Sequence, residues 1–157
     1  MKLYLDNCCF NRPYDSQTTN KILIETRAKL LVQDEIRAGK HELVGSYMLE
    51  YENEQNPFEM KKQTIRTFQK QYSTQYVSFE LRESLIAKIN EITRYNIHYK
   101  DATHVACAIY AKCDYLLTTD ARLQQRYRGD EIRIVNPVEF VRLESEKEET
   151  EELCPRK

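Results

Sequence analysis

Short apolar runs alternate with longer stretches of helical periodicity along this chain of 157 residues. The apolar runs are too short for helices, so each predicts a strand: they cover residues 1–5, 43–46, 76–79, 115–117 and 132–135. Apolar spacings of three and four residues predict helices over 19–38, after Ser46, and over 59–72, 80–95, 101–111, 121–127 and 137–143. This alternation predicts an α/β fold, a three-layer α/β/α sandwich with a mainly parallel central sheet.

Local signals refine two of these segments. Residues 7–15 contain Asn and Pro at several positions and predict a loop after the first strand. In the helix predicted over 19–38, one stripe carries Ile24, Ala28, Leu31 and Glu35, and Gly39 is a suitable stop. We therefore expect this stripe to face the core.

The charge of the chain is divided unevenly between a body and a tail. Residues 144–157 hold six glutamates against three basic residues, a net charge of −3, which leaves +2 for residues 1–143. The tail has no apolar face and is expected to be frayed or disordered. The chain thus predicts one folded domain over 1–143 and an acidic, disordered tail over 144–157.

Cysteine usage and hydropathy point to a cytoplasmic protein. Five cysteines, an odd number without paired spacing, indicate reduced thiols rather than a disulfide framework. The apolar start is broken at Asp6, and no apolar run approaches the roughly 20 residues of a membrane span. A zinc cluster of His104, Cys107 and Cys113 would lack a fourth ligand, so we expect His104 to be neutral and packed on its helix.

Four acids follow the predicted strands or lie near the starts of the predicted helices. Asp6 and Asp120 each end a strand, and Glu50 and Asp101 lie in early turns of helices. In a parallel sheet these positions meet at one edge, where four carboxylates repel one another unless they are protonated or bridged by a cation. A hard, oxygen-seeking ion such as Mg²⁺ or Mn²⁺ is the natural bridge. This chemistry suggests metal-dependent hydrolysis of a phosphodiester.

The sequence around these acids resembles the four acidic motifs of PIN-domain ribonucleases. The matching segments are LDN at 5–7, SYMLE at 46–50, KDATHVA at 100–106 and LLTTD at 116–120. The motifs occur in the family's order, and the resemblance covers roughly residues 1–140. Many small PIN proteins are the toxins of bacterial and archaeal toxin–antitoxin pairs.

The resemblance implies a role for each matched position. Asp6, Glu50, Asp101 and Asp120 would be the catalytic, metal-binding acids, and Asn7 and Thr118 would orient a ligand or water beside them. It further implies Mg²⁺- or Mn²⁺-dependent endonucleolytic cleavage of RNA, an antitoxin protein as partner, and a homodimer. Glu50 keeps the better distance from Ser46, with Glu52 open as the alternative second acid.

Three arginines are candidates to bind the RNA backbone. Arg122 and Arg126 lie about one turn apart directly after Asp120, and Arg12 lies in the segment that follows Asp6. Guanidinium groups bind phosphate through paired N–H donors.

A different class of function stays open beside the nuclease. A PIN-like domain that has lost catalysis could still bind RNA or a protein, because a fold does not guarantee an activity. The presence of all four acids favours the enzyme. A phosphate-accepting receiver domain would need a lysine at the end of a late strand, and residues 132–136 offer none.

Overall fold

The computed structural model describes residues 1–154 and contains one five-stranded sheet in which every neighbouring pair of strands is parallel. The strand order is β3-β2-β1-β4-β5. The strands are β1 (Lys2–Leu5), β2 (Glu42–Ser46), β3 (Ser73–Val77), β4 (Tyr115–Leu117) and β5 (Arg133–Val135).

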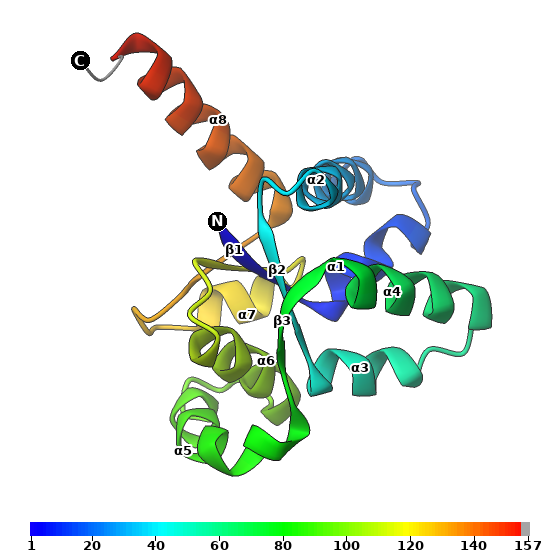
Figure 1. Cartoon of the computed structure of the whole chain (residues 1–157), viewed down its shortest axis with the longest axis vertical. Coiled ribbons are helices and arrows are strands. Elements are labelled where there is room, and N and C mark those ends of the chain that lie inside the picture. The colour runs from blue at the N-terminus through cyan, green and yellow to red at the C-terminus, as the bar shows by residue number, and fades with distance from the viewer. Residues whose placement is uncertain (155–157) are drawn as a thin grey trace.

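Helices cover both faces of this sheet, which Figure 1 shows edge-on with α2 and α4 on one side and α5 and α6 on the other. The helices are α1 (Asn7–Asn11), α2 (Asn20–Arg37), α3 (Tyr47–Glu54), α4 (Glu59–Tyr72), α5 (Arg82–Thr93), α6 (Tyr99–Tyr110), α7 (Ala121–Arg126) and α8 (Pro137–Leu153). Short 3₁₀ turns cover Arg12–Tyr14 and Phe79–Leu81. The predicted three-layer α/β/α architecture is confirmed.

The two central strands carry the innermost part of the core. Leu3, Tyr4 and Leu5 of β1 and Leu116 and Leu117 of β4 are completely buried. Strands that are covered on both faces need continuous apolar runs, which is why these segments were recognisable in the sequence. β2 and β5 also lie where they were predicted, and α4 has the predicted bounds.

Two local predictions need correction. Residues 7–14 form α1 and a 3₁₀ turn rather than a loop, because the Asp6 carboxylate caps the first turn by accepting from the backbone N–H of Asn7 at 2.7 Å. The third strand covers Ser73–Val77 instead of 76–79. It is an edge strand that is only partly buried, so most of its residues are polar and its apolar signal is weak.

The stripe expected to bury α2 was only partly right, since Ala28 is buried but its two large apolar residues are not. Ile24 and Leu31 are 51% and 45% exposed, whereas the buried face carries Glu25, Lys29 and Val32, among others. Two charged residues lie on the buried face because they have partners there.

The buried charges of α2 contact side chains of other elements and, for Lys29, of α2 itself. Glu25 accepts a hydrogen bond from the Nδ2 of Asn136 and lies 3.5 Å from the guanidinium of Arg12. The Lys29 ammonium donates to Gln33 and lies 5.4 Å from the ring centre of Phe10. These contacts fix the rotation of α2 against the sheet.

The acidic tail is helical over residues 144–153, not disordered. α8 runs through to Leu153, so the boundary expected after residue 143 falls inside a helix. His41 Nε2 lies 3.0 Å from Glu144 Oε2, and Lys40 Nζ donates to Glu148 Oε1 at 2.8 Å. These contacts satisfy part of the acidic charge, and the rest of the expected tail, residues 155–157, lies outside the described residues. Within residues 1–154, no helix combines the length and apolar content needed to cross a membrane.

Replacing Lys29 with Met is predicted to change how stability depends on pH. Burial lowers the pKa of Lys29 from 10.5 to about 8. Below pH 8 the folded protein therefore holds a buried ammonium, a penalty that disappears as the folded lysine loses its proton while the unfolded chain stays protonated. The stability advantage of Lys29→Met over wild type should shrink by up to about 3 kcal/mol between pH 7 and 10.5.

Chemical denaturation of both proteins at a series of pH values measures this difference. Lys21→Met, at an exposed lysine of the same helix, is the matched control and should show no comparable pH trend. A difference between Lys29→Met and wild type that stays constant over this range contradicts the prediction.

Candidate metal centre

Asp6 and Asp120 meet at the carboxyl ends of β1 and β4. The backbone N–H of Asp6 donates to the carbonyl of Leu117 at 2.9 Å, which places Asp6 beside the end of β4. Thr118 then connects the two acids: its Oγ1 donates to Asp6 Oδ2 at 3.0 Å and accepts from the backbone N–H of Asp120 at 3.1 Å. Thr118 thus orients the Asp6 carboxylate and holds the backbone of Asp120.

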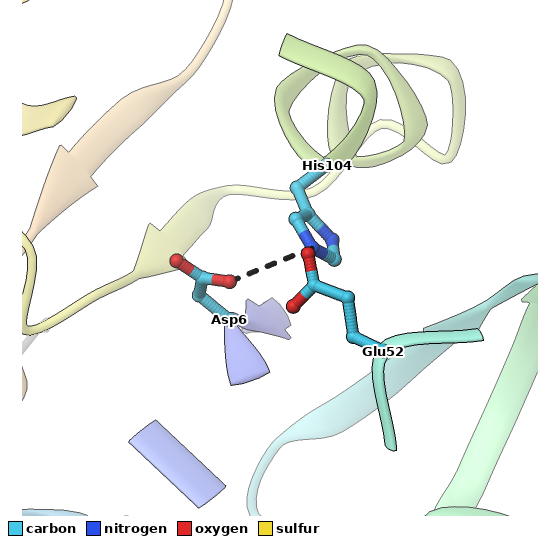
Figure 2. Close-up of side chains that lie close together, drawn as sticks. All are labelled: Asp6, Glu52 and His104. Atoms are coloured by element: carbon cyan, nitrogen blue, oxygen red, sulfur yellow. Dashed lines mark hydrogen bonds and ion pairs between the residues drawn. The ribbon is translucent and has the colours of Figure 1, made fainter. Parts of the chain in front are cut away.

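Glu52 and His104 complete the arrangement around Asp6. Figure 2 shows Glu52 from α3 and His104 from α6 converging on the Asp6 carboxylate. His104 Nε2 lies 2.9 Å from Glu52 Oε1 and 3.7 Å from Asp6 Oδ1. One donor atom from each of the three residues falls within 4.8 Å of the others, close enough for one metal ion.

The His104 ring is completely buried and is held at both nitrogens. Its Nδ1 lies 2.6 Å from the hydroxyl of Tyr4, which lies 2.6 Å from Ser46 Oγ. Burial alone would lower the pKa of His104, but the hydrogen bond to Glu52 and the charge of Asp6 outweigh it, so the pKa is raised. When the ring is protonated, it donates from both nitrogens and compensates the neighbouring carboxylates.

The same partnership acts on Glu52. Burial alone would raise the pKa of the Glu52 carboxyl, yet the hydrogen bond and charge of His104 hold it below its usual value. Glu52 is therefore kept as an anion although it is largely buried.

Asp101 and Asp120 form the other half of the site. Burial, followed by the negative charge of Asp6, raises the pKa of Asp101, with smaller contributions from Asp120 and Glu52. The charges of Asp6, Asp120 and Glu52 thus all act on Asp101. We call these four residues, Asp6, Glu52, Asp101 and Asp120, the acid group. Asp120 also caps α7, since its Oδ1 accepts from the backbone N–H of Arg122 at 2.8 Å.

The structure separates Glu50 from the acid group. Tyr76 Oη donates to Glu50 Oε2, 2.5 Å away, and Glu50 lines a different pocket of about 340 Å³ together with Arg66 and Lys70. Residues two positions apart on a helix differ by about 200° in direction, so Glu50 and Glu52 of α3 face opposite ways. Of the two acids left open by the sequence, the structure brings Glu52 to Asp6, and the first choice of Glu50 is corrected.

Of the three arginines proposed to bind the RNA backbone, two lie beside the acid group and one does not. Arg122 and Arg126 line a pocket of about 70 Å³ together with Asp101 and Asp120. The Arg12 guanidinium instead pairs with Asp15 just after its own turn at 3.0 Å and with Glu25 of α2 at 3.5 Å, so it is engaged away from the acids.

Asn7 lies next to the acid group. Its side-chain Oδ1 is buried and has no hydrogen-bond partner among residues 1–154. The same residue contributes to the lowered pKa of Glu52. Asn7 therefore keeps unused hydrogen-bonding capacity at the edge of the site.

The contacts of His104 were not predicted. This residue was expected to be a neutral packing residue; it is buried, but its ring also lies close to the carboxylates of Glu52 and Asp6. A local signal existed, because His104 follows Asp101 by three residues and both therefore project from the same side of α6. The identity of its main partner, Glu52, is a long-range contact that local spacing does not reveal.

The carboxylate oxygens of the acid group suit a hard divalent cation, and the ligand atoms of Asp6, Glu52 and His104 lie within 4.8 Å of one another, whereas Asp101 and Asp120 lie outside that cluster. The oxygens of the acid group come from four carboxylates, the ligands that Mg²⁺ and Mn²⁺ prefer. The raised pKa of His104 reflects the negative charge of its neighbours, and the raised pKa of Asp101 reflects burial first and the charge of Asp6 second. Asp6, Glu52, Asp101 and Asp120 would hold such an ion. Glu35, His41 and Glu144 form a second group with suitable spacing, located at the start of β2.

Mn²⁺ or Mg²⁺ is predicted to stabilise the folded protein through the acid group. An ion that binds only the folded state adds about 2.7 kcal/mol at a concentration of 100 times its Kd. The increase in melting temperature on adding Mn²⁺ should be lost in Asp6→Asn and Glu52→Gln and retained in Glu50→Gln, the matched control on the same helix. A metal-induced increase that survives in Asp6→Asn and Glu52→Gln but disappears in Glu50→Gln would place the ion elsewhere.

The fold is shared with three solved structures. FitAcB from Neisseria gonorrhoeae is 15% identical with a TM-score of 0.52, over 86% of this chain and 97% of that one. FitAB bound to an IR36 DNA fragment is 16% identical with a TM-score of 0.54, over 87% and 95% of the two chains. VapBC2 from Rickettsia felis, bound to a DNA fragment from their promoter, is 12% identical with a TM-score of 0.52, over 87% and 98%.

These similarities extend over nearly the full length of the compared chains. No protein-family model and no curated sequence matches this chain. At such low identities the structural similarities establish the fold, and the PIN-like fold that the four motifs predicted is confirmed.

Proposed function

We propose that this PIN-like domain is a metal-dependent endoribonuclease whose acid group binds Mg²⁺ or Mn²⁺ at the carboxyl edge of the sheet. The observation that carries the proposal is the convergence of Asp6, Glu52 and His104, with Asp101 and Asp120 in the same electric field. Carboxylates gathered in this way are costly to a fold unless a cation or proton compensates them. That cost is understandable at a catalytic centre, where perturbed carboxylates cluster.

The residues around the acid group have separable roles in this reaction. A divalent cation bound there supplies an activated water and neutralises charge that develops on the phosphodiester. Thr118 orients Asp6, and His104 orients Glu52. Arg122 and Arg126, beside Asp101 and Asp120, are placed to bind the phosphate that is cleaved.

The biological setting is proposed from the family resemblance and the shared fold. A toxin that acts on RNA in the cytoplasm, as a homodimer controlled by an antitoxin protein, agrees with the four motifs. The structural neighbours FitAB and VapBC2 support the toxin–antitoxin part of this proposal. Both were solved bound to DNA, and the DNA bound to VapBC2 is a fragment from their promoter.

A catalytically silent PIN-like module that binds RNA or protein is the second candidate. The observation that favours it is His104, whose buried ring lies 2.9 Å from Glu52 and 3.7 Å from Asp6 and, when protonated, supplies the positive charge that an ion would otherwise bring. A metal ion would either take the unprotonated ring as a ligand beside Asp6 and Glu52 or bind on the Asp101 and Asp120 side of it.

RNA cleavage should require both the divalent ion and the acid group. Purified protein incubated with total cellular RNA and Mn²⁺ or Mg²⁺ should give discrete cuts that EDTA prevents. Asp6→Asn and Glu52→Gln should each lower the cleavage rate by more than about 100-fold, since even residues that only orient metal ligands cost 10- to 100-fold. Glu50→Gln should cleave within a few-fold of wild type.

The separate outcomes assign the function. Cuts that persist in EDTA or in Asp6→Asn would contradict metal-dependent cleavage by the acid group. RNA binding without any cleavage, under conditions where Mn²⁺ still stabilises the fold, would favour the silent module.

A further inference from the structure

A second pocket adjoins the acid group and is rich in carboxamides. It measures about 240 Å³ and lies where α1 meets the corner between α3 and α4. Its wall includes Glu52 of the acid group, four carboxamides and one aromatic ring. We call it the amide pocket, and its defining residues are Asn7, Asn11, Gln55, Asn56, Phe58 and Lys61.

The carboxamides of this pocket hold part of their hydrogen-bonding capacity in reserve. Asn11 and Asn56 are engaged at both ends: Asn11 Nδ2 donates to the carbonyl of Asn7 at 2.9 Å, Asn56 Nδ2 donates to Asn11 Oδ1 at 3.4 Å, and Asn56 Oδ1 accepts from the backbone N–H of Phe58 at 3.2 Å. The reserve therefore lies in the other two carboxamides. Asn7 Oδ1 is buried without a partner among the described residues, and the Gln55 side chain is exposed to solvent. A buried acceptor without a partner is costly unless a ligand satisfies it.

Groups that attract RNA surround the opening of the amide pocket. Phe58 follows Pro57 as the last residue before α4. Its side chain is 66% exposed, which is unusual for a large aromatic ring. The Lys61 ammonium lies 6.0 Å from the centre of the Phe58 ring and 5.3 Å from that of Tyr14. Aromatic faces stack on unpaired bases, and an ammonium group binds the phosphate that follows.

These features match one chemical class of ligand. A nucleobase presents a flat face for stacking and an edge of mixed donors and acceptors, which carboxamides complement through paired hydrogen bonds. The pocket is smaller than those that hold drug-sized ligands, as a single base requires. Because Glu52 belongs to both the pocket and the acid group, a base bound here lies beside the reacting phosphodiester.

We propose that the amide pocket binds one unpaired base of the RNA next to the cleaved bond and so sets the sequence preference of the enzyme. This inference rests on the proposed nuclease function. Phe58 provides the stacking surface, and the carboxamides read the edge of the base. Phe58 is therefore a specificity residue rather than a metal ligand.

The test measures RNA binding separately from cleavage. Binding is measured in the Asp6→Asn background with short single-stranded homopolymers of A, C, G and U. Phe58→Ala should weaken binding by about 10-fold, as expected for the loss of one stacked base, and Phe58→Tyr should restore it. Gln55→Ala should change the ranking of the four homopolymers.

Tyr110→Ala is the matched control. Tyr110 is an aromatic residue that is 46% exposed at the far end of α6 from Asp101, so its loss should leave RNA binding unchanged. The proposal would be overturned if, in the Asp6→Asn background, the proteins with and without Phe58→Ala bound every homopolymer with equal affinity. This outcome does not depend on whether the wild type cleaves RNA.

Cleavage of an RNA pool randomised around the cut site provides the second readout. Phe58→Ala should raise KM and broaden the preference at one position, while kcat on the preferred sequence stays within a few-fold of wild type. If the wild type cuts with a sequence preference and neither Phe58→Ala nor Gln55→Ala changes it, the proposed role of the amide pocket is excluded and the nuclease function is retained. Absence of cleavage with Phe58-dependent RNA binding would exclude the nuclease while keeping the pocket.

Discussion

Repulsion among carboxylates at one end of a parallel sheet is the constraint on which the site depends. The sheet topology brings Asp6 and Asp120 together, and the following helices add Glu52 and Asp101. The buried His104 ring lies beside these acids, and their negative charge raises its pKa. The site therefore carries negative charge that a divalent cation could also compensate.

The buried chain of contacts around His104 explains how distant segments are held in register. Ser46 ends β2 and caps α3, because the backbone N–H of Leu49 donates to its hydroxyl. The same hydroxyl contacts Tyr4 of β1, which contacts His104 of α6. Glu52 closes the chain from α3. One polar network thus connects β1, β2, α3 and α6 at the edge where the chemistry is proposed.

The sequence could predict the sheet and the two strand-end acids because each depends on local pattern. Completely buried strands are short apolar runs; Asp6 follows β1 directly, and Asp120 follows β4 after two threonines. The choice between Glu50 and Glu52 depends on how α3 is rotated, and spacing from Ser46 does not determine that rotation. His104 was misjudged for a related reason, since its main partner lies 52 positions earlier in the chain.

Long-range contacts also explain the two larger errors in the fold. The buried face of α2 is charged because Glu25 meets Asn136 and Arg12, so the apolar stripe with Ile24 faces outward instead. The tail was expected to be disordered because its own residues lack an apolar face. Lys40 and His41 at the start of β2 meet its glutamates and continue α8 beyond the predicted end.

The measurement that tests the central claim most directly is the location of Mn²⁺ by anomalous X-ray diffraction from crystals grown with the ion. The account predicts one or two peaks about 2.1 Å from carboxylate oxygens of the acid group, with Asp6 among the ligands. A peak only at Glu35, His41 and Glu144, or none at millimolar Mn²⁺, would contradict a metal-binding role for the acids at the carboxyl edge of the sheet.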